Sequence, residues 1–538
     1  MTKKLTQKLG SLFSALVLLF GLLAAIPGSL STAHAASSIK VTINSTGAAY
    51  SGYQLLKADV GSDDAVTYTL NSKYKDIVLK AASDASGKTV SDFAGLKDFI
   101  KDHTKSDNST AGEDATLRKF ADAVYKGISS AKLAADQTFK SGENTLSTDN
   151  AGYYLLADAT ADSADTPHQY SATLLTALVN KDVTLNVKST TPDVHKKVMN
   201  SEGTKYEDAT DYNIGDTVPF MITGTISSQI KSYDKYTYYF TDTLPKGLTL
   251  DESSIVVQAE NVTSGYAQGI KATDATKLTK DTDYTVTTTK NDDGTTTFKV
   301  ELTDLKKLVT DDKVKASDTI AVTYNAKLNE NAVVGQAGNI NKVKLTYSNN
   351  PYKDGTGTTT ERNAKVYTYE LLVNKTGNGG KALTGAGFTL QKKDGDTYKT
   401  IATIDPDHTT DNSKIVAKIV NGSKFEFSGL DQGEYKIEES TVPKGYKKAD
   451  DIEFTISATF ENQNAADAAL KTLSVDNTAL SVNKTDSGVI ETTVNNKSDS
   501  AFVLPSTGGM GRYIFLGLGA LVVVLAIAAP SLKKKREN

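Results

Sequence analysis

The stretch YTVTTTKNDDGTTTFKV, residues 284–300, decides the fold class of this chain. Apolar residues stand at every second position on both sides of Asp293-Gly294, and this is the spacing of a strand with one buried face. These apolar positions are Tyr284, Val286, Phe298 and Val300. An Asp-Gly pair favours a tight hairpin turn because glycine readily adopts a positive φ. Two antiparallel strands joined by a short turn are therefore expected.

The same alternation recurs along the chain, from Val218 to Ile226 and from Phe388 to Ile401, where Asp394-Gly395 marks another turn. Helical spacing of apolar residues is concentrated between Val90 and Leu133. The expected fold is mainly β, with tandem immunoglobulin-like antiparallel β-sandwich domains and a helical insertion in the first of them.

Length divides the chain of 538 residues into about three domains at roughly 150 residues each, once its terminal segments are set aside. Boundaries are expected near residues 189 and 362, which gives domains at 36–189, 190–362 and 363–500. The net charge of -4 gives no reason to expect a nucleic-acid partner. The chain has no cysteine, so disulfides cannot stabilise it.

Three polar residues of the third domain, Lys375, Glu439 and Asn496, share the parity of apolar residues in their strands. These apolar neighbours are Leu371, Val373, Tyr435, Ile437, Ile490 and Val494. Burial of an unpaired ammonium or carboxylate is costly, so an inward lysine and acid shift their pKa values until both are neutral. A neutral amine is a nucleophile, and a protonated acid can polarise the asparagine carbonyl. Attack of Nζ on Cγ would expel ammonia and leave an isopeptide bond.

The third domain also resembles a CnaB-type isopeptide-forming domain. The resemblance is carried by Val373-Asn374-Lys375, GLDQGEY at 429–435, ESTVPKGY at 439–446 and Val494-Asn495-Asn496. It implies that Lys375 and Asn496 are the bonded pair and that Glu439 is the catalytic acid. Asn495 and Glu438 are register alternatives, and parity favours Asn496 and Glu439.

The second domain repeats this pattern, because Lys196, Asp242 and Asn341 share the parity of apolar neighbours. It resembles the D2-type isopeptide-forming domain of fimbrial backbone proteins. The matching segments are 211–220, 240–248 and 345–350. The implied bond joins Lys196 to Asn341 with Asp242 as the acid, and Asn349 is a rival acceptor on the same parity.

The first domain is expected to lack such a crosslink, because Lys40 points outward and leaves Asp158 without a buried amine. Its last strand leaves Lys188 exposed before the linker. In sortase-assembled major pilins, a lysine at this junction accepts the threonine carbonyl of the next subunit, so Lys188 is the expected polymerisation lysine. Asn186-Val187 replaces the family's Tyr-Pro before this lysine, and Lys181 and Lys197 are alternatives.

Both chain ends carry apolar segments outside the expected fold. Lysines, an apolar core and Ala33-His34-Ala35 predict a secretory signal peptide at 1–35. At 501–538, an apolar run at 513–530 is long enough to span a membrane, and a basic tail follows it. The run is preceded by Leu504, Pro505, Ser506, Thr507 and Gly508. This order resembles the LPxTG signal of Gram-positive sortase substrates, in which the enzyme's cysteine takes the threonine carbonyl and passes it to an amine.

These resemblances imply a sortase-assembled Gram-positive major pilin, the structural backbone subunit of a covalently polymerised pilus anchored to the cell wall. The implied partners are a pilus-type or housekeeping sortase, identical subunits, peptidoglycan, minor pilins and host or microbial surface ligands. The alternative is a monomeric LPxTG-anchored surface adhesin. Turnover of an external substrate is not expected, because no histidine lies beside a nucleophile pattern, and no metal or cofactor motif appears.

Overall fold

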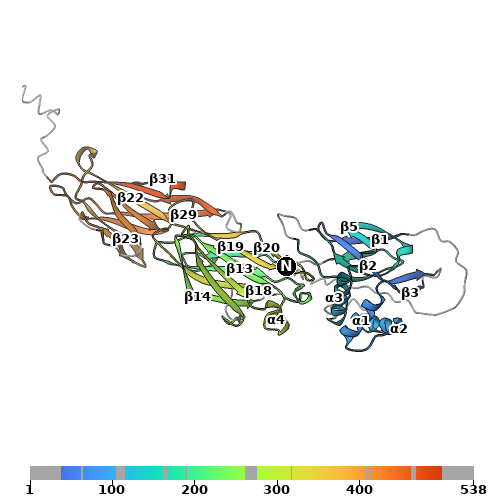
Figure 1. Cartoon of the computed structure of the whole chain (residues 1–538). Helices are drawn as coiled ribbons and strands as arrows, with labels where there is room; N and C mark the ends of the chain where they lie inside the picture. Colours follow the sequence, from blue (N-terminus) through green and yellow to red (C-terminus); the bar gives the residue numbers. More distant parts are fainter. Residues whose placement is uncertain are drawn as a thin grey trace, which may run out of the picture.

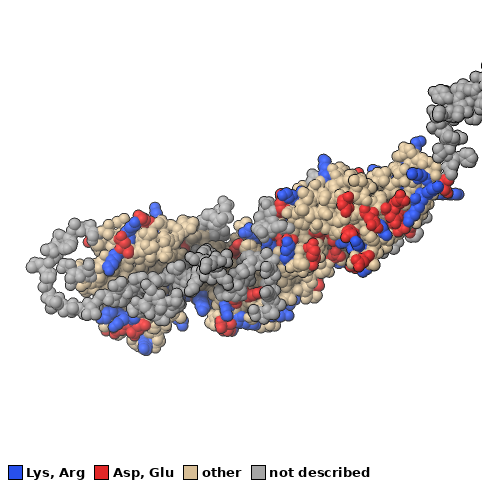
Figure 2. Space-filling view, turned by 180° about the vertical axis from the view of Figure 1, so that it is seen from behind, with Lys and Arg blue, Asp and Glu red and all other residues tan. Residues whose placement is uncertain are grey.

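The structure is a computed structural model that describes most of the chain between residues 38 and 499. The described residues are 38–61, 65–103, 115–161, 168–187, 191–260, 275–316, 318–406, 409–410, 415–461 and 468–499. Three β-sandwich domains follow one another along an elongated molecule (Figure 1). The expected fold class is therefore confirmed. Acidic and basic side chains are interspersed over the face seen in Figure 2.

The first domain packs a three-stranded sheet against a five-stranded sheet. The small sheet has the order β5-β1-β8, with β1 (Ser38–Asn44), β5 (Gly142–Ser147) and β8 (Val183–Asn186). The larger sheet has the order β3-β2-β6-β7, and β4 pairs with β2. Its strands are β2 (Ala49–Val60), β3 (Val66–Leu70), β4 (Gln137–Lys140), β6 (Gly152–Asp158) and β7 (Leu174–Leu178), and the short helix η1 (Thr148–Asn150) precedes β6.

Three helices pack against the large sheet of the first domain and form a second core there (Figure 1). They are α1 (Lys75–Ser86), α2 (Phe93–His103) and α3 (Ala115–Ser130). The helical region begins earlier than the sequence indicated, because α1 lies ahead of Val90. Alanines supply much of its buried face, Ala81 and Ala82 among them, and they give a weaker apolar signal than the larger residues of α2 and α3.

The second domain packs a six-stranded sheet, β10-β9-β12-β18-β14-β15, against a seven-stranded sheet, β11-β21-β19-β13-β17-β16 with β20 beside β19. The first sheet contains β9 (Val194–Met199), β10 (Tyr206–Glu207), β12 (Thr217–Thr225), β14 (Leu248–Glu260), β15 (Thr276–Lys277) and β18 (Thr319–Leu328). The second contains β11 (Ala209–Asp211), β13 (Tyr238–Leu244), β16 (Tyr284–Lys290), β17 (Thr296–Leu302), β19 (Asn339–Ser348), β20 (Thr356–Thr358) and β21 (Arg362–Tyr367). The short helices η2 (Ile230–Ser232) and α4 (Leu305–Thr310) lie between strands.

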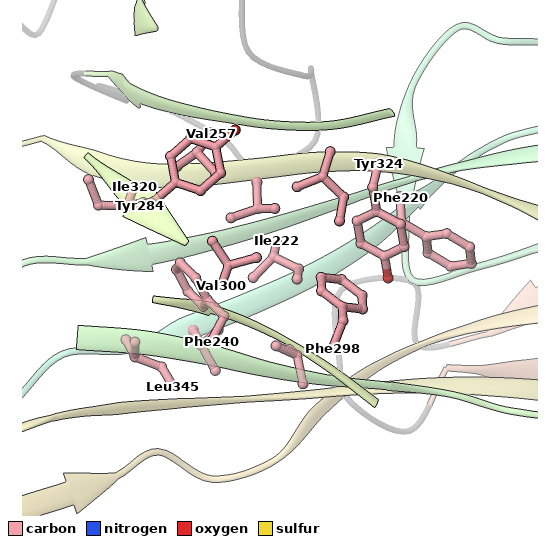
Figure 3. Close-up of a cluster of buried hydrophobic side chains, with 14 of the residues drawn as sticks. Phe220, Ile222, Phe240, Val257, Tyr284, Phe298, Val300, Ile320, Tyr324 and Leu345 are labelled. Atoms are coloured by element: carbon pink, nitrogen blue, oxygen red, sulfur yellow. The ribbon is translucent and has the colours of Figure 1, made fainter. Parts of the chain in front are cut away.

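The hairpin expected at residues 284–300 forms as β16 and β17. Tyr284 pairs with Leu302, and Gly294 has a φ of 83° in the turn. The inward side chains of this hairpin join those of the opposite sheet in one core, part of which Figure 3 shows.

The third domain packs a five-stranded sheet, β26-β27-β22-β32-β31, against a six-stranded sheet, β25-β24-β23-β28-β29-β30. The first contains β22 (Tyr369–Thr376), β26 (Val416–Asn421), β27 (Lys424–Leu430), β31 (Leu480–Lys484) and β32 (Val489–Asn495). The second contains β23 (Gly387–Asp394), β24 (Thr397–Ile404), β25 (Thr409–Thr410), β28 (Gly433–Thr441), β29 (Ile452–Glu461) and β30 (Ala469–Val475). Short helices η4 (Asn378–Gly380) and η5 (Thr485–Ser487) connect strands.

The domain junctions are hydrogen-bonded. Tyr352 of the second domain donates to Asp122 Oδ1 of the first at 2.8 Å, and Tyr369 of the third donates to Asp211 Oδ2 of the second at 2.9 Å. The expected boundary at 362 falls at the start of β21. Since β21 pairs with β19, the sheet of the second domain extends to Tyr367.

Within the described part of the chain, no helix is long and apolar enough to cross a membrane. Several expectations lie outside the described residues: the signal peptide at 1–35, Lys188, the LPSTG motif at 504–508 and the transmembrane segment at 513–530.

Candidate functional site

Each of the second and third domains buries a lysine, an acid and an asparagine together. In the second domain, Lys196 projects from β9 of the six-stranded sheet and is 2 % exposed. Asp242 on β13 and Asn341 on β19 project from the opposite sheet, and both are 0 % exposed. Asp242 pairs with Val343, so Asn341 is its diagonal neighbour two residues along, on the same face.

A tyrosine joins the three members of this cluster. Lys196 Nζ forms an ion pair with Asp242 Oδ2 and donates to the Tyr324 hydroxyl at 2.7 Å. The Tyr324 hydroxyl donates to Asp242 Oδ2 at 3.1 Å and accepts from Asn341 Nδ2 at 2.7 Å. Sequence patterns did not single out Tyr324. The sequence did offer a signal for it, because Tyr324 shares the inward parity of Val322 on β18. A tyrosine hydroxyl buried in this way needs a hydrogen-bond partner, which would have pointed to a polar group nearby.

Burial drives the lysine and the acid of this cluster toward their neutral forms. It lowers the pKa of Lys196 and raises the pKa of Asp242, and in each case the partner's charge opposes this effect. Burial also raises the pKa of Tyr324 well above its usual range, so the phenol stays protonated. Asp242 Oδ1 and Asn341 Oδ1 are buried without a hydrogen bond to any described residue. A protonated Asp242 carboxyl would add a further hydrogen-bond donor to this site.

Aromatic rings enclose the cluster. Phe220 stacks on Tyr324 with ring centroids 5.4 Å apart, and Phe298 contacts Tyr324 edge-on at 4.9 Å (Figure 3). Lys196 Nζ lies 5.4 Å and 5.2 Å from the centroids of Phe220 and Tyr324. Such an apolar enclosure excludes water and strengthens the electrostatic effects inside it.

The third-domain cluster has a different arrangement. Lys375 on β22 and Asn496, which follows β32, belong to the same sheet, because these two strands pair in parallel. Asn496 N donates to Thr376 O at 3.0 Å and so continues the ladder. Glu439 faces them from β28 of the opposite sheet. The exposed fractions of Lys375, Glu439 and Asn496 are 1 %, 3 % and 1 %.

The lysine and the acid here hold opposite ends of the asparagine amide. Lys375 Nζ donates to Asn496 Oδ1 at 2.6 Å, and Asn496 Nδ2 donates to both oxygens of Glu439 at 2.8 Å and 3.0 Å. Nζ lies 3.8 Å from Glu439 Oε1. Burial lowers the pKa of Lys375, and the charge of Glu439 opposes this. The amine of Lys375 and the carboxyl of Glu439 are thus both in hydrogen-bond contact with the side-chain amide of Asn496.

The alternative residues occupy other environments. Asn495 is exposed, with its Oδ1 accepting from Thr376 Oγ1 at 3.2 Å, and Glu438 forms a partly exposed ion pair with Lys448 at 2.6 Å. Asn349 is buried, but its Nδ2 donates to the backbone oxygen of His168 at 3.0 Å, at the junction with the first domain.

The first domain places its own candidates differently. Lys40 is exposed and forms an ion pair with Glu143, whereas Asp158 Oδ2 lies 2.9 Å from His168 Nε2. Of the alternative polymerisation lysines, Lys197 is buried in an ion pair with Asp208 at 2.8 Å, while Lys181 is exposed.

Comparison with known families gives three matches. Residues 214–351 match the model of the Gram-positive pilin backbone subunit 2, Cna-B-like domain, and residues 369–469 match a prealbumin-like fold domain. Residues 496–538 match the LPXTG cell wall anchor motif. Residues 214–351 therefore carry a domain of the Gram-positive pilin backbone type, and the anchor motif makes the chain a protein of the cell wall and cell surface.

Individual relatives are similar over most of the chain. The trypsin-resistant surface T6 protein of Streptococcus pyogenes serotype M6 is 22 % identical over 410 residues, which cover 65 % of this chain and 70 % of the relative. The solved structure of the T6 backbone pilin of serotype M6, described as modular and three-domain, matches with a TM-score of 0.52 at 20 % identity, covering 87 % of this chain and all of that one. The full-length major pilin SpaD from Corynebacterium diphtheriae matches with a TM-score of 0.43 at 16 % identity, over 86 % and 98 % of the two chains.

Proposed function

We propose that this chain is the structural backbone subunit of a covalently polymerised, cell-wall-anchored pilus, and that autocatalytic Lys196–Asn341 and Lys375–Asn496 isopeptide bonds stabilise it. A sortase joins each subunit at Thr507 to a lysine of the next, and Lys188 is the proposed acceptor. The observation that carries the bond assignment is the burial of a lysine, an acid and an asparagine within one hydrogen-bonded cluster in each of two separate sandwiches.

The proposed reaction uses only groups of the chain. A buried ammonium passes its proton to the neighbouring carboxylate, because burial favours the neutral pair. The neutral Nζ then attacks Cγ of the asparagine, and the acid protonates the amide nitrogen. Ammonia leaves, and the attacking nitrogen returns its surplus proton to the carboxylate. The protein does this once per bond, so it is a structural protein and a substrate of sortase rather than a turnover enzyme.

The position of the third-domain bond suits a fibre under tension. Lys375 lies on β22, the first strand of its domain, and Asn496 directly follows β32, the last. A covalent link between these strands carries force from one end of the domain to the other. The strands in between are bypassed, so tension along the pilus cannot peel the sandwich apart.

The bond assignment is tested by intact-mass spectrometry of residues 36–507 produced without sortase. The mass should fall short of the sequence value by two ammonia losses, roughly 17 Da each. Peptide mapping should place one loss at each lysine–asparagine pair. An unmodified mass would refute the two bonds.

Polymerisation is tested separately in the parent cell. A ladder of SDS-resistant high-mass species that collapses on Lys188→Ala supports the pilus with Lys188 as the acceptor. Lys181→Ala removes a rival acceptor and should leave the ladder intact; collapse of the ladder on Lys181→Ala instead would assign the acceptor to Lys181. One discrete wall-linked band would instead support the monomeric adhesin.

A further inference from the structure

The two clusters differ in how the acid reaches the amide. In the third domain, Glu439 contacts Asn496 Nδ2 directly with both oxygens. In the second domain, the acid is an aspartate, one methylene shorter, and the Tyr324 hydroxyl stands between it and Asn341. That hydroxyl lies 3.1 Å from Asp242 Oδ2 and 2.7 Å from Asn341 Nδ2.

We propose that Tyr324 is a catalytic proton relay for the Lys196–Asn341 bond and passes the proton of Asp242 to the departing amide nitrogen. This inference rests on the proposed function and adds a residue that the lysine, acid and asparagine alone do not supply. Tyr324 qualifies because its hydroxyl contacts Lys196 Nζ, Asp242 Oδ2 and Asn341 Nδ2 at once.

The proton balance closes through this hydroxyl. The neutral Nζ attacks Cγ of Asn341, which forms the new N–C bond and places the carbonyl electron pair on oxygen. Nδ2 then has a lone pair, so the Tyr324 hydroxyl can donate to it while taking the Asp242 proton. Nζ returns its surplus proton to the Asp242 carboxylate, the oxygen electron pair restores the C=O bond, and the Cγ–Nδ2 bond breaks to release NH₃. Asp242 and Tyr324 end in the protonation states in which they began.

The surroundings favour a relay through side chains. Tyr324 is 2 % exposed, and its ring is held between Phe220 and Phe298, which fixes the direction of the hydroxyl (Figure 3). Since the phenol stays protonated, it can pass a proton on without acting as the base.

The test compares Tyr324→Phe with wild type, using residues 36–507 and following ammonia loss over time by intact mass and peptide mapping. Phenylalanine keeps the ring packing and removes only the hydroxyl. We expect the Lys196–Asn341 bond to form at least about 100-fold more slowly, the lower range for a general acid–base contribution. The Lys375–Asn496 bond is an internal control and should form at the wild-type rate.

A second variant separates catalysis from folding. Tyr238 is buried in the same core, and its hydroxyl donates to Thr225 O at 3.2 Å, so Tyr238→Phe removes a comparable hydroxyl outside the cluster. It should form both bonds normally. The relay is overturned if Tyr324→Phe forms the second-domain bond at the wild-type rate, or if Tyr238→Phe slows it equally. Absence of this bond from wild type would instead refute the Lys196–Asn341 bond of the proposed function.

Discussion

Replacement of Lys375 by methionine should remove the third-domain crosslink while leaving its surroundings intact. Methionine has a similar length and no charge, so it fills the buried site without leaving an unpaired cation. Without the lysine, Asn496 retains its amide, so Glu439 still accepts hydrogen bonds from Asn496 Nδ2 and from Ala449 N at 2.9 Å. The variant therefore differs from wild type mainly in the missing covalent link.

The size of the effect follows from the chain that the bond encloses. Lys375 and Asn496 are 121 positions apart. Closing a loop of this length lowers the conformational entropy of the unfolded chain, and on an entropy model developed for disulfides this raises the free energy of unfolding by about 5 kcal/mol. Residues 369–499 form a domain of about 130 residues, for which this free energy corresponds to a fall of about 15–20 °C in melting temperature.

The assay is differential scanning calorimetry of residues 36–507, with the mass of each sample measured first. Lys418→Met is the matched control, since Lys418 is exposed and forms an ion pair with the partly buried Glu426. Its loss should change stability by about 0.5 kcal/mol or less. The reasoning fails if Lys375→Met shows the same ammonia loss as wild type, because another residue would then be the nucleophile. It also fails if the bond is absent from Lys375→Met and the melting temperature of the third domain equals that of wild type.

Three further predictions concern the third domain and its junction with the second. Glu439→Gln has no proton to give the leaving nitrogen, so mass spectrometry should show one ammonia loss instead of two. Burial, followed by the charge of Asp431, raises the pKa of Asp211 from 3.8 to about 7, so the folded chain holds a proton that the unfolded chain has lost between these pH values. The free energy of unfolding should therefore fall across this window by up to about 4 kcal/mol as the pH rises. Denaturant titrations at pH 5 and pH 8 should show this fall in wild type and not in Asp211→Asn. An equal pH dependence in the two proteins would contradict this assignment. Gly429 has a φ of 96°, and an added Cβ would lie 2.6 Å from the Ile214 side chain. Gly429→Ala should therefore destabilise the junction by about 1–3 kcal/mol in the same titrations. A variant as stable as wild type would show that the junction adapts to the added methyl group.

Strand parity accounts for much of what could be predicted about the candidate sites. Period-two spacing tells which side chains share a face, and it predicts that Lys196, Asp242 and Asn341 lie on the inward face. The structure finds all three buried there. Parity could not choose between Asn341 and Asn349, because both have the same spacing. The choice depends on position along β19, where Asn349 lies past the end of the strand at the junction with the first domain.

Local spacing and turn chemistry were enough to predict the sandwich class, the hairpin at residues 284–300 and the inward position of the two lysine, acid and asparagine sets. Which of these inward residues meet is set by tertiary packing. Tyr324 reaches the cluster because β18 pairs with β12, which also pairs with β9, and the two sheets then face each other. Such contacts depend on the register between strands far apart in the chain. A pattern of period two cannot distinguish registers that differ by two residues, because such a shift keeps every side chain on the same face.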